Sequence, residues 1–395
     1  MMRVLINGLA ASAGGGLTYL RNVIPQFAAR RDVEIGVALP LSLQREFRDL
    51  PKVCFLEMHP AKSIAARFWQ EQTVLPSLIR QAGADVLISA GNFALRKSPV
   101  PQILLSRNAL YTSADFYRDL RRRHEYSMWC DTRVRSALGK RSILWADCTV
   151  APSEAFAKEL RRWTGRDVIA IHHGFDHEMF FRDHTPLPPQ IWEKVKTDRD
   201  DFRILLVSHY NYFRNFETLL GAIPLLREQL GGRNIKLFLT CRLKVNENPG
   251  SYRPETAAAL IAQLGIAESV VELGAVPYRR LHHLYRACDV YVAPAYAESF
   301  AHPLVEGMAS GLPIVASDLP VHREICGDAA LYFPRFSSQD LAAAISRVAS
   351  SRDLAAGLSA SGLQRSKEFS WKQHVDQITS LAGNLAAAEG NLKAA

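Results

Sequence analysis

The feature that most constrains the fold of this chain is an alternation of short apolar segments with amphipathic ones, which runs through the sequence twice. Strand-like segments separated by helical patterns are typical of parallel sheets with helices on both faces. In the first half, strands are expected at residues 3–8, 33–39, 53–58, 86–90, 103–106, 148–153 and 168–173. In the second half, strands are expected at residues 202–208, 235–240, 270–274, 289–294, 313–317 and 330–333, followed by helices near 338–350, 352–368 and 371–388.

The two series predict two domains. The stretch PLPPQIWEKVKTDRDD between them is proline-rich and charged and has no strand pattern, which is typical of a linker. A chain of 395 residues is long enough for two domains with their own cores. We therefore predict an α/β protein with two Rossmann-like domains. The expected bounds are 1–178 for the N-terminal domain, 179–201 for the linker, 202–370 for the C-terminal domain and 371–395 for a terminal helix.

Composition narrows the class of protein. A content of 48% hydrophobic and 22% charged residues is typical of a globular chain, and no apolar run reaches the length of a membrane-spanning helix. The six cysteines are scattered without a CxxC motif, so we expect small buried hydrophobes in a reducing compartment and no zinc site. The N-terminal stretch MMRVLINGLAASAGGG resembles a secretory signal, but cleavage would remove the first strand. We expect a cytoplasmic protein.

In open parallel sheets, ligands bind at the carboxyl ends of the strands, and anions favour helix N-termini. Three loops meet both conditions. The first contains Gly14, Gly15 and Gly16 after the first strand, where a phosphate could approach the backbone without obstruction by a Cβ atom. This loop is neither GxGxxG nor GxxxxGK[ST]. Its alternative interpretation is a flexible glycine turn.

The second loop follows the first strand of the C-terminal half. His209 and Arg214 lie just before an expected helix that begins near Asn215 and has Glu217 in its first turn. A diphosphate could lie against this helix N-terminus and the guanidinium of Arg214. The alternative is a surface loop with an ordinary arginine.

The third loop is ESFAHPLVEGMASGLPIVAS. We expect Glu298 in a loop above the sheet, Pro303 in the first turn of a helix, and Glu306 one turn further in. The backbone N–H groups of Phe300 and Ala301 would lie beside the helix N-terminus. The element would offer two carboxylates for hydroxyl groups and several donors for anionic oxygens, and a nucleotide-sugar has both. The alternative is a capped helix with two partly exposed glutamates.

This third segment resembles the Glu-x7-Glu element of the retaining GT-B glycosyltransferases of family 4, also called group 1. The resemblance covers nearly the whole chain. It includes ADCTVAPSEAFAKELRRWTG, VIAIHHGFDHEMF, VELGAVPYRRLHHLYRACDVYVAPAYAESF, GLPIVASDLPVHREICGDAALYF and FSWKQHVDQI. It implies the GT-B fold, with two Rossmann-like domains that face each other across a cleft and a C-terminal helix that crosses back to the N-terminal domain.

The resemblance also implies roles for individual residues. It implies that Glu306 binds the ribose, that Glu298 contacts hydroxyls of the donor sugar, and that the amides of Phe300 and Ala301 lie near the sugar and phosphate. Arg214 matches the lysine that holds the diphosphate in the family. These positions form the donor site that we predict.

Other positions match the family less closely. His209 stands where an arginine is usual, and a neutral histidine supplies less charge. Ala301 and the following histidine replace a commoner Gly-Leu pair. In the N-terminal half, the resemblance places Gly15 and Gly16 near the donor phosphate and the acceptor. The segment SRNALY has Arg107 and Asn108 where a histidine or aspartate is common, so a catalytic histidine cannot be transferred there, and we expect this pair on the acceptor side.

The activity implied is a retaining hexosyltransferase of class EC 2.4, which moves a sugar from a UDP-, GDP- or ADP-sugar to an acceptor hydroxyl. The leaving diphosphate would help to deprotonate the acceptor, while Arg214 and loop amides stabilise it. No metal and no further cofactor is expected, and the Asp-x-Asp in DRDD is interpreted as solvated charge. By analogy, the acceptor would be a lipid-linked or polysaccharide glycan.

Two other classes of function remain open at this point. A nucleotide-sugar epimerase or phosphorylase could share the architecture, and a partner subunit could keep the fold without catalysis. A dehydrogenase fits less well because the first loop lacks GxGxxG and no acidic residue ends the second strand. Acceptor-dependent turnover of a nucleotide-sugar would separate a transferase from an epimerase.

The positive charge is concentrated in residues 118–141. This segment has eight basic and three acidic residues, so it carries +5 of the total net charge of +9. With its apolar and aromatic residues, it could bind an anionic inner membrane leaflet and bring the active site to a lipid-linked acceptor. The alternative is a solvated, arginine-rich helix that packs its aromatic side chains into the N-terminal domain. No nucleic-acid partner is expected.

Overall fold

The structure is a computed structural model that describes residues 1–11, 15–50, 52–58, 61, 63–198 and 200–394. The chain divides into two compact units. Unit 1 consists of Met1–Thr112, Glu125–Gly174 and Ser370–Ala395, and unit 2 consists of Ser113–His124 and Phe175–Phe369. The chain therefore passes from one unit to the other four times.

Unit 1 is built on a seven-stranded, all-parallel sheet with the order β3-β2-β1-β4-β5-β6-β7. Every strand expected in the first half is present. The strands are β1 (Met2–Asn7), β2 (Val33–Ala38), β3 (Val53–Phe55), β4 (Val86–Ser89), β5 (Gln102–Leu105), β6 (Cys148–Ala151) and β7 (Ile169–Ala170). The helices are α1 (Gly15–Ala28), α2 (Leu41–Gln44), α3 (Ile64–Thr73), α4 (Leu75–Gln81), α6 (Tyr126–Trp145), α7 (Glu154–Thr164) and α17 (Trp371–Ala394), with short turns η1 (Arg45–Phe47) and η2 (Ala109–Tyr111).

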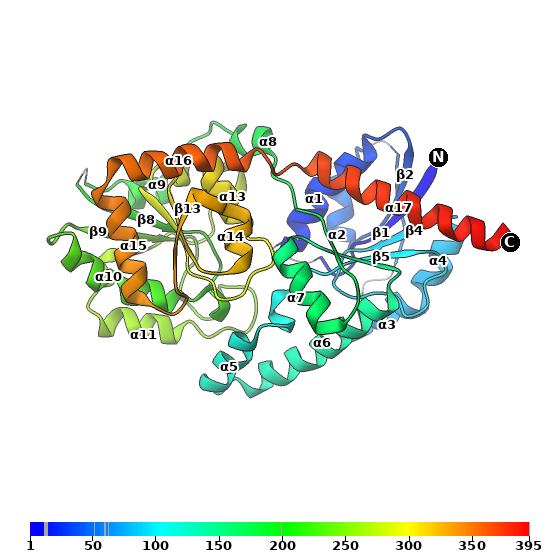
Figure 1. Ribbon diagram of the computed structural model, residues 1–395, viewed down its shortest axis with the longest axis horizontal. Helices are drawn as coiled ribbons and strands as arrows, with labels where there is room; N and C mark the ends of the chain where they lie inside the picture. The colour runs from blue at the N-terminus through cyan, green and yellow to red at the C-terminus, as the bar shows by residue number, and fades with distance from the viewer. Residues whose placement is uncertain (12–14, 51, 59–60, 62, 199, 395) are drawn as a thin grey trace. The chain divides into compact units, whose positions relative to one another are not determined.

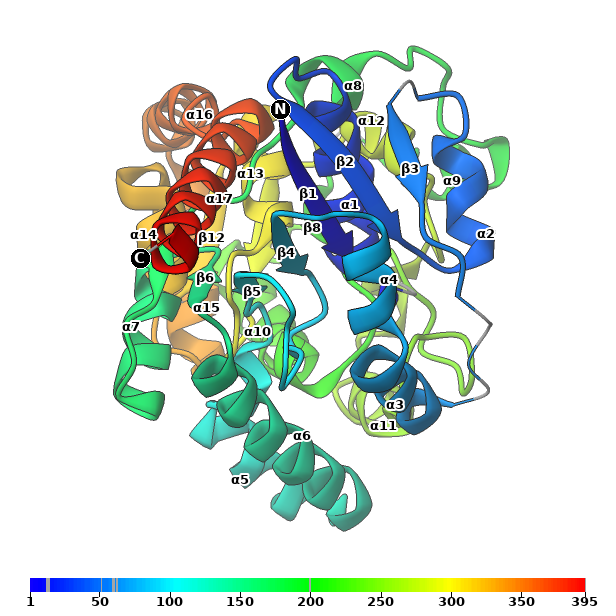
Figure 2. The same cartoon turned by 90° about the vertical axis from the view of Figure 1, so that its right-hand side faces the viewer.

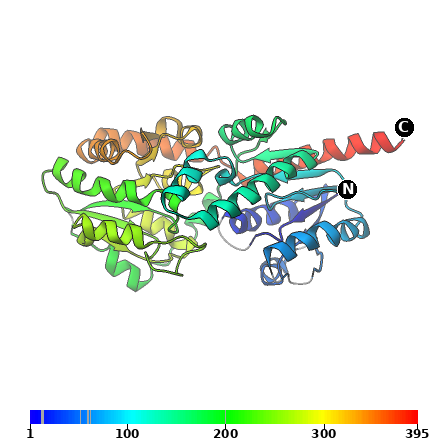
Figure 3. The same cartoon turned by 90° about the horizontal axis from the view of Figure 1, so that it is seen from below.

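The sheet of unit 1 has an apolar layer on each face because successive side chains of a strand point to opposite sides. Val4 and Ile6 of β1 join the cluster that α1 and α17 cover, whereas Leu5 joins the cluster under α4. Figures 2 and 3 show the terminal helix α17 running along this unit to the C-terminus. The return of the last helix to the N-terminal unit agrees with the expected fold.

The start of α17 is fixed by a close crossing. A Cβ atom at Gly174 would lie 2.0 Å from the backbone nitrogen of Trp371, so only glycine fits there. The ring of His374 contacts the Tyr19 hydroxyl at 3.0 Å and the carbonyl of His172 at 2.8 Å. The chain is thus closely packed at one of the points where it leaves unit 1.

Unit 2 repeats the architecture with six parallel strands in the order β10-β9-β8-β11-β12-β13. All six expected strands are present, and α10 and α15 lie side by side against the sheet (Figure 1). The strands are β8 (Phe202–Leu206), β9 (Ile235–Leu239), β10 (Val270–Glu272), β11 (Val290–Ala293), β12 (Ile314–Ser317) and β13 (Ala330–Phe333). The helices are α5 (Ala114–Arg122), α8 (His177–Phe181), α9 (Pro189–Val195), α10 (Phe216–Gln229), α11 (Glu255–Gln263), α12 (Leu281–Arg286), α13 (His302–Ala309), α14 (Pro320–Cys326), α15 (Ser338–Ser350) and α16 (Arg352–Ser366), with turns η3 (Tyr212–Arg214), η4 (Ala267–Ser269), η5 (Tyr278–Arg280) and η6 (Gly327–Ala329).

Three features differ from the sequence interpretation. Residues 113–124, expected in the N-terminal domain, belong to unit 2, because Phe116 and Leu120 of α5 are buried there. The expected linker 179–201 contains α9, of which Ile191 and Val195 are buried. Cys54 and Cys130 are exposed, contrary to the expectation of buried cysteines, although all six thiols are free.

Candidate functional site

The candidate site lies in unit 2, where the strand order changes direction. From β8 the chain continues to β9 and β10 on one side of the sheet, and it then returns to β11 on the other side of β8. The neighbouring strands β8 and β11 therefore flank a topological switch point. Ligands of open α/β sheets bind at such a point, beyond the carboxyl ends of the strands. The loop after β8 carries Arg214, and the loop after β11 carries Glu298.

The structure brings these two predicted residues together. The Arg214 guanidinium donates a hydrogen bond to the Glu298 carboxylate and forms an ion pair with it. The two side chains are 24% and 11% exposed, so the pair is mostly shielded from water. Arg214 Nε is also buried and has no hydrogen-bond partner among the described residues. The guanidinium therefore has an unused donor.

Backbone contacts hold the two loops to each other. The Tyr296 amide donates to the carbonyl of Phe213 at 2.9 Å, and the Asn215 side chain donates to the carbonyl of Pro294 at 3.0 Å. Asn215 has a left-handed backbone with φ 55° and precedes α10, where the sequence predicted a helix to begin. The Arg214–Glu298 pair thus rests on a shared backbone framework.

The charge state of Glu298 follows from two opposing effects. Burial by itself would raise the pKa of Glu298, but the charge of Arg214 and a smaller contribution from the Ser299 amide outweigh it, and the net pKa is lowered. The carboxylate is therefore ionised at neutral pH. For His209, on the same loop as Arg214, loss of hydration around the ring and then the Arg214 charge lower the pKa, so this histidine adds no positive charge at neutral pH.

Glu306 lies inside α13 as predicted, and its residue is only 5% exposed. The Tyr285 hydroxyl donates to its carboxylate at 2.9 Å. Burial raises the pKa of Glu306 to about 7, which the Tyr285 hydrogen bond only partly offsets. The alternative considered from the sequence, two partly exposed glutamates, is wrong for Glu306, which is buried, whereas the Glu298 side chain keeps 11% exposure.

The start of α13 has an unusual backbone. Ala301 precedes the helix with φ 68° and ψ 68°, a left-handed conformation that costs an alanine about 1 kcal/mol or more. The Phe300 side chain is 2% exposed and packs edge-on against Phe369, so its predicted role concerns only its backbone amide.

Sequence reasoning missed His322, which is completely buried in α14 after β12. The Ser317 hydroxyl donates to the carbonyl of Ala295, so it can only accept from His322 Nδ1, 3.1 Å away. The proton is therefore on Nδ1, and Nε2 is a buried acceptor without a hydrogen-bond partner among the described residues. Burial lowers the pKa of His322 to about 4, so the ring is neutral. In the sequence, only the position of His322 shortly after the strand β12 could have indicated a functional role.

The predicted residues of unit 1 also come together. Arg107 donates to the carbonyls of Gly15, at 3.5 Å, and Ala90, and its guanidinium lies 4.7 Å from the centre of the Tyr19 ring. Gly16 lies beside the same guanidinium, with room for a Cβ atom. Asn108 instead caps η2 by accepting from the Leu110 amide at 3.0 Å. Gly14 lies outside the described residues.

Unit 1 contains a second buried carboxyl that the sequence did not indicate. Glu71 of α3 is 4% exposed, and burial raises its pKa to about 7. It lies near Arg67 of the same helix and near Asn7 at the carboxyl end of β1. A buried carboxyl with a raised pKa at a strand end is the kind of group found at functional sites.

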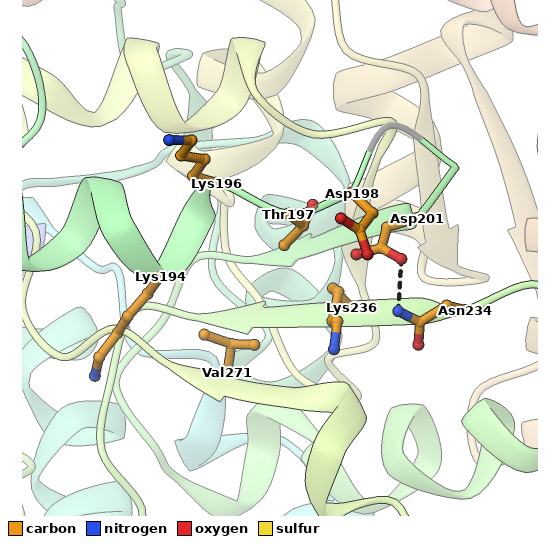
Figure 4. Close-up of a pocket in the computed structure, with 8 residues that line it drawn as sticks. All are labelled: Lys194, Lys196, Thr197, Asp198, Asp201, Asn234, Lys236 and Val271. Carbon is orange, nitrogen blue, oxygen red and sulfur yellow. Dashed lines mark hydrogen bonds between the residues drawn. The ribbon is translucent and has the colours of Figure 1, made fainter.

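The DRDD stretch, whose Asp-x-Asp is formed by Asp198 and Asp200, lies elsewhere in unit 2. Asp198 and Asp201 line a hollow at the amino-terminal ends of β8 and β9, opposite the edge that carries the candidate site (Figure 4). Three lysines line the same hollow, and Asn234 donates to Asp201 at 2.5 Å. Among the described residues, no three His, Cys, Asp or Glu side chains are grouped as metal ligands would be.

Comparisons with known proteins agree with this architecture. Residues 13–179 match the model of "Glycosyltransferase Family 4", and residues 189–365 match that of "Glycosyl transferases group 1". A stretch of 70 residues is 43% identical to a D-inositol 3-phosphate glycosyltransferase of Nocardia farcinica, covering 18% of this chain and 16% of that protein. The matches span less than half the length of the curated relatives.

Solved structures share the fold over almost the whole chain. The sucrose-phosphate synthase of Thermosynechococcus elongatus superposes with a TM-score of 0.74 at 18% identity, covering 98% of this chain and 100% of that one. Anabaena HepE in complex with UDP-glucose gives a TM-score of 0.71, also at 18% identity and with the same coverage. The two family models and these superpositions lead to one conclusion: the chain belongs to the family 4, group 1 glycosyltransferases and has their GT-B fold.

Proposed function

We propose that this chain is a retaining glycosyltransferase that transfers a sugar from a nucleoside diphosphate-sugar to an acceptor hydroxyl. The observation that carries the proposal is the largely shielded Arg214–Glu298 pair at the switch point of unit 2, with the buried Glu306 on the adjoining helix. A cation and two carboxyls are what a donor with a diphosphate, a ribose and a sugar requires. Because HepE was solved with UDP-glucose, that compound is the first donor to test.

The pair of Arg214 and Glu298 is suited to exchange partners when the donor binds. The donor diphosphate would take the Arg214 guanidinium, including its unused Nε, and Glu298 would then accept hydrogen bonds from the sugar hydroxyls. Glu306 would accept from the ribose hydroxyls. The contacts of Arg214 and Glu298 with the donor would replace the hydrogen bond that these two side chains make with each other, so little of their own desolvation remains to be overcome.

The proposed chemical step needs no side chain as nucleophile. The bond between the anomeric carbon and the diphosphate oxygen breaks, and the acceptor oxygen attacks from the same face. The acceptor proton passes to the leaving diphosphate, which Arg214 and the loop amides stabilise. The protein supplies position and charge. We propose that the reaction needs no metal and no cofactor beyond the donor.

For the acceptor, we propose a lipid-linked or polysaccharide glycan that contacts unit 1 near Arg107, Gly15 and Gly16. The exposed face of α6 supports a peripheral membrane position: Val134 is 69% exposed and Leu144 45%, and the exposed Arg141 lies between them. No helix among the described residues is long and apolar enough to cross a bilayer. Binding to anionic vesicles that weakens with salt is expected, and absence of binding would leave α6 as a solvated helix.

Calorimetry tests the donor site directly. UDP, GDP, ADP and their sugars would be titrated into the wild type and into Glu306→Ala. Tight binding of one nucleotide that is lost in the variant supports the proposal. If no nucleotide binds, the donor site is degenerate, and the histidine at position 209 in place of the usual arginine is the leading explanation.

Turnover and stereochemistry separate the remaining alternatives. Release of the nucleoside diphosphate only with an acceptor, and an NMR spectrum that shows the anomeric configuration of the donor in the product, are expected for a retaining transferase. Acceptor-independent conversion of the donor would indicate an epimerase. Activity that survives EDTA is expected, and its loss would show a metal requirement.

A further inference from the structure

We propose that Asp119 and Arg123 are positioning residues for the donor site. Both belong to the α5 segment, residues 113–124, which the sequence assigned to the other domain. They act through the loop that carries Arg214 and the loop that carries Glu298. The inference rests on the proposed function, since it concerns the same site.

The α5 segment docks on unit 2 through apolar anchors. Phe116 and Leu120, one helical turn apart, are 1% and 0% exposed. The Phe116 ring lies edge-on to Phe213, the residue directly before Arg214, with 6.3 Å between ring centres. The segment is therefore fixed against the turn that carries the predicted diphosphate ligand.

Arg123 supports the loop after β8. Its guanidinium donates to Asp119 at 2.9 Å, forms an ion pair with Glu217 of α10 at 3.0 Å, and lies 4.3 Å from the centre of the Tyr212 ring. The same Glu217 oxygen accepts from the Tyr210 hydroxyl at 2.9 Å. Tyr210 and Tyr212 are almost completely buried. The interior of this loop is thus held between α10 and the α5 segment.

Asp119 supports the loop after β11. Its second oxygen accepts from the hydroxyl of Tyr296 at 2.7 Å, and Tyr296 is only 4% exposed. Tyr296 lies two residues before Glu298, and its amide is bonded to Phe213. One carboxylate therefore joins Arg123, which supports one loop, to Tyr296, which belongs to the other.

The network is shielded enough to matter energetically. The side chains of Arg123, Asp119 and Glu217 are 17%, 16% and 20% exposed. Burial would lower the pKa of Arg123, but Glu217 and Asp119 outweigh it and raise the pKa, so the guanidinium stays charged. Neutralising Asp119 leaves Arg123 with Glu217 as its remaining counter-charge in a site with little water, so the loops would have to move to restore the lost interaction.

Kinetic variants separate positioning from general stability. Asp119→Asn is expected to weaken UDP-glucose affinity and to slow UDP release at saturating donor by about ten- to hundredfold, since a displacement of about 1 Å can cost that much. Tyr296→Phe removes a single oxygen, keeps the ring packed, and should show a smaller loss in the same direction. If Asp119 acts through Tyr296, the double variant should be no worse than Asp119→Asn alone.

Arg203→Gln provides the matched control. Arg203 pairs with Asp289 at 3.2 Å, both side chains are 31% exposed, and the pair lies at the opposite edge of the same sheet. Its loss should leave UDP-glucose affinity and UDP release within about twofold. If Arg203→Gln reduces both as strongly as Asp119→Asn does, the positioning role is refuted.

Hydrogen exchange on the unliganded protein tests the same inference without activity. In Asp119→Asn and Tyr296→Phe, peptides covering 207–215 and 294–301 should exchange faster than in the wild type, while β9 and β12 stay protected. Unchanged exchange in both loops would overturn the proposal. If the wild type binds no nucleotide-sugar, the proposed function fails, and the exchange result still decides whether the α5 segment holds the loops.

Discussion

Glu306 should make the stability of this protein depend on pH in a direction unusual for a glutamate. Its pKa is about 7 in the folded chain against an ordinary value of 4.5. The unfolded chain therefore loses this proton at lower pH than the folded chain. The stability associated with neutral Glu306 is complete below pH 4.5 and is lost as the pH rises to about 7. The difference of about 2.5 pH units, at 1.36 kcal/mol each, amounts to about 3 kcal/mol.

The perturbation that isolates this effect is Glu306→Gln. Glutamine has nearly the same shape, can accept the Tyr285 hydrogen bond, and does not ionise. Any cost of burying its NH2 group is the same at every pH. The variant should therefore gain up to about 3 kcal/mol relative to the wild type between pH 4.5 and pH 8. Other titrating groups, including Glu71, cancel in the comparison.

The assay is guanidinium unfolding of both proteins at half-unit steps from pH 4.5 to pH 8, followed by a signal that reports on unit 2. Glu298→Gln serves as a control with no slope, because the lowered pKa of Glu298 gives stability that is complete above pH 4.5 and is lost only at lower pH, so its difference from the wild type should stay nearly constant over this range. A difference between Glu306→Gln and the wild type that does not change with pH would refute the reasoning.

Further predictions concern the donor site and the chain crossing. Affinity for UDP-glucose, whose diphosphate diester does not titrate near neutrality, should rise about tenfold from pH 6 to pH 8 as Glu306 ionises, and calorimetry at both pH values would show a flat response if the carboxyl has no role. His322→Ala removes the buried acceptor Nε2, so it should reduce UDP release from UDP-glucose about tenfold and leave the affinity for UDP nearly unchanged. Equal losses in turnover and in UDP affinity would show that His322 does not act on the sugar. Gly174→Ala should lower the thermal midpoint by several degrees because its Cβ atom meets Trp371, and an unchanged midpoint would contradict the crossing. Ala301→Gly should raise the free energy of unfolding by up to about 1 kcal/mol by relieving the left-handed backbone, and a loss in denaturant melts would count against it.

The sequence determined the framework because its signals are local. A strand of four to six apolar residues and a helix of period 3.6 are recognisable within one segment, so all thirteen strands and the last three helices could be placed before the fold was known. The loops that carry Arg214, Glu298 and Glu306 followed from the rule that sites lie at the carboxyl ends of parallel strands.

Only the tertiary structure decided which side chains meet. Arg214 and Glu298 are 84 residues apart, and Asp119 and Tyr296 are 177 apart, so no local pattern joins them. The tautomer of His322 depends on the Ser317 hydroxyl, which donates its proton to the carbonyl of Ala295 and can therefore only accept from His322. The position of the α5 segment on unit 2 likewise comes from the packing of Phe116 and Leu120. An amphipathic pattern predicts that these two side chains are buried, but it does not specify which surface covers them. Local periodicity gives each element its apolar face, and the free energy of the whole packed chain selects the surface that covers it.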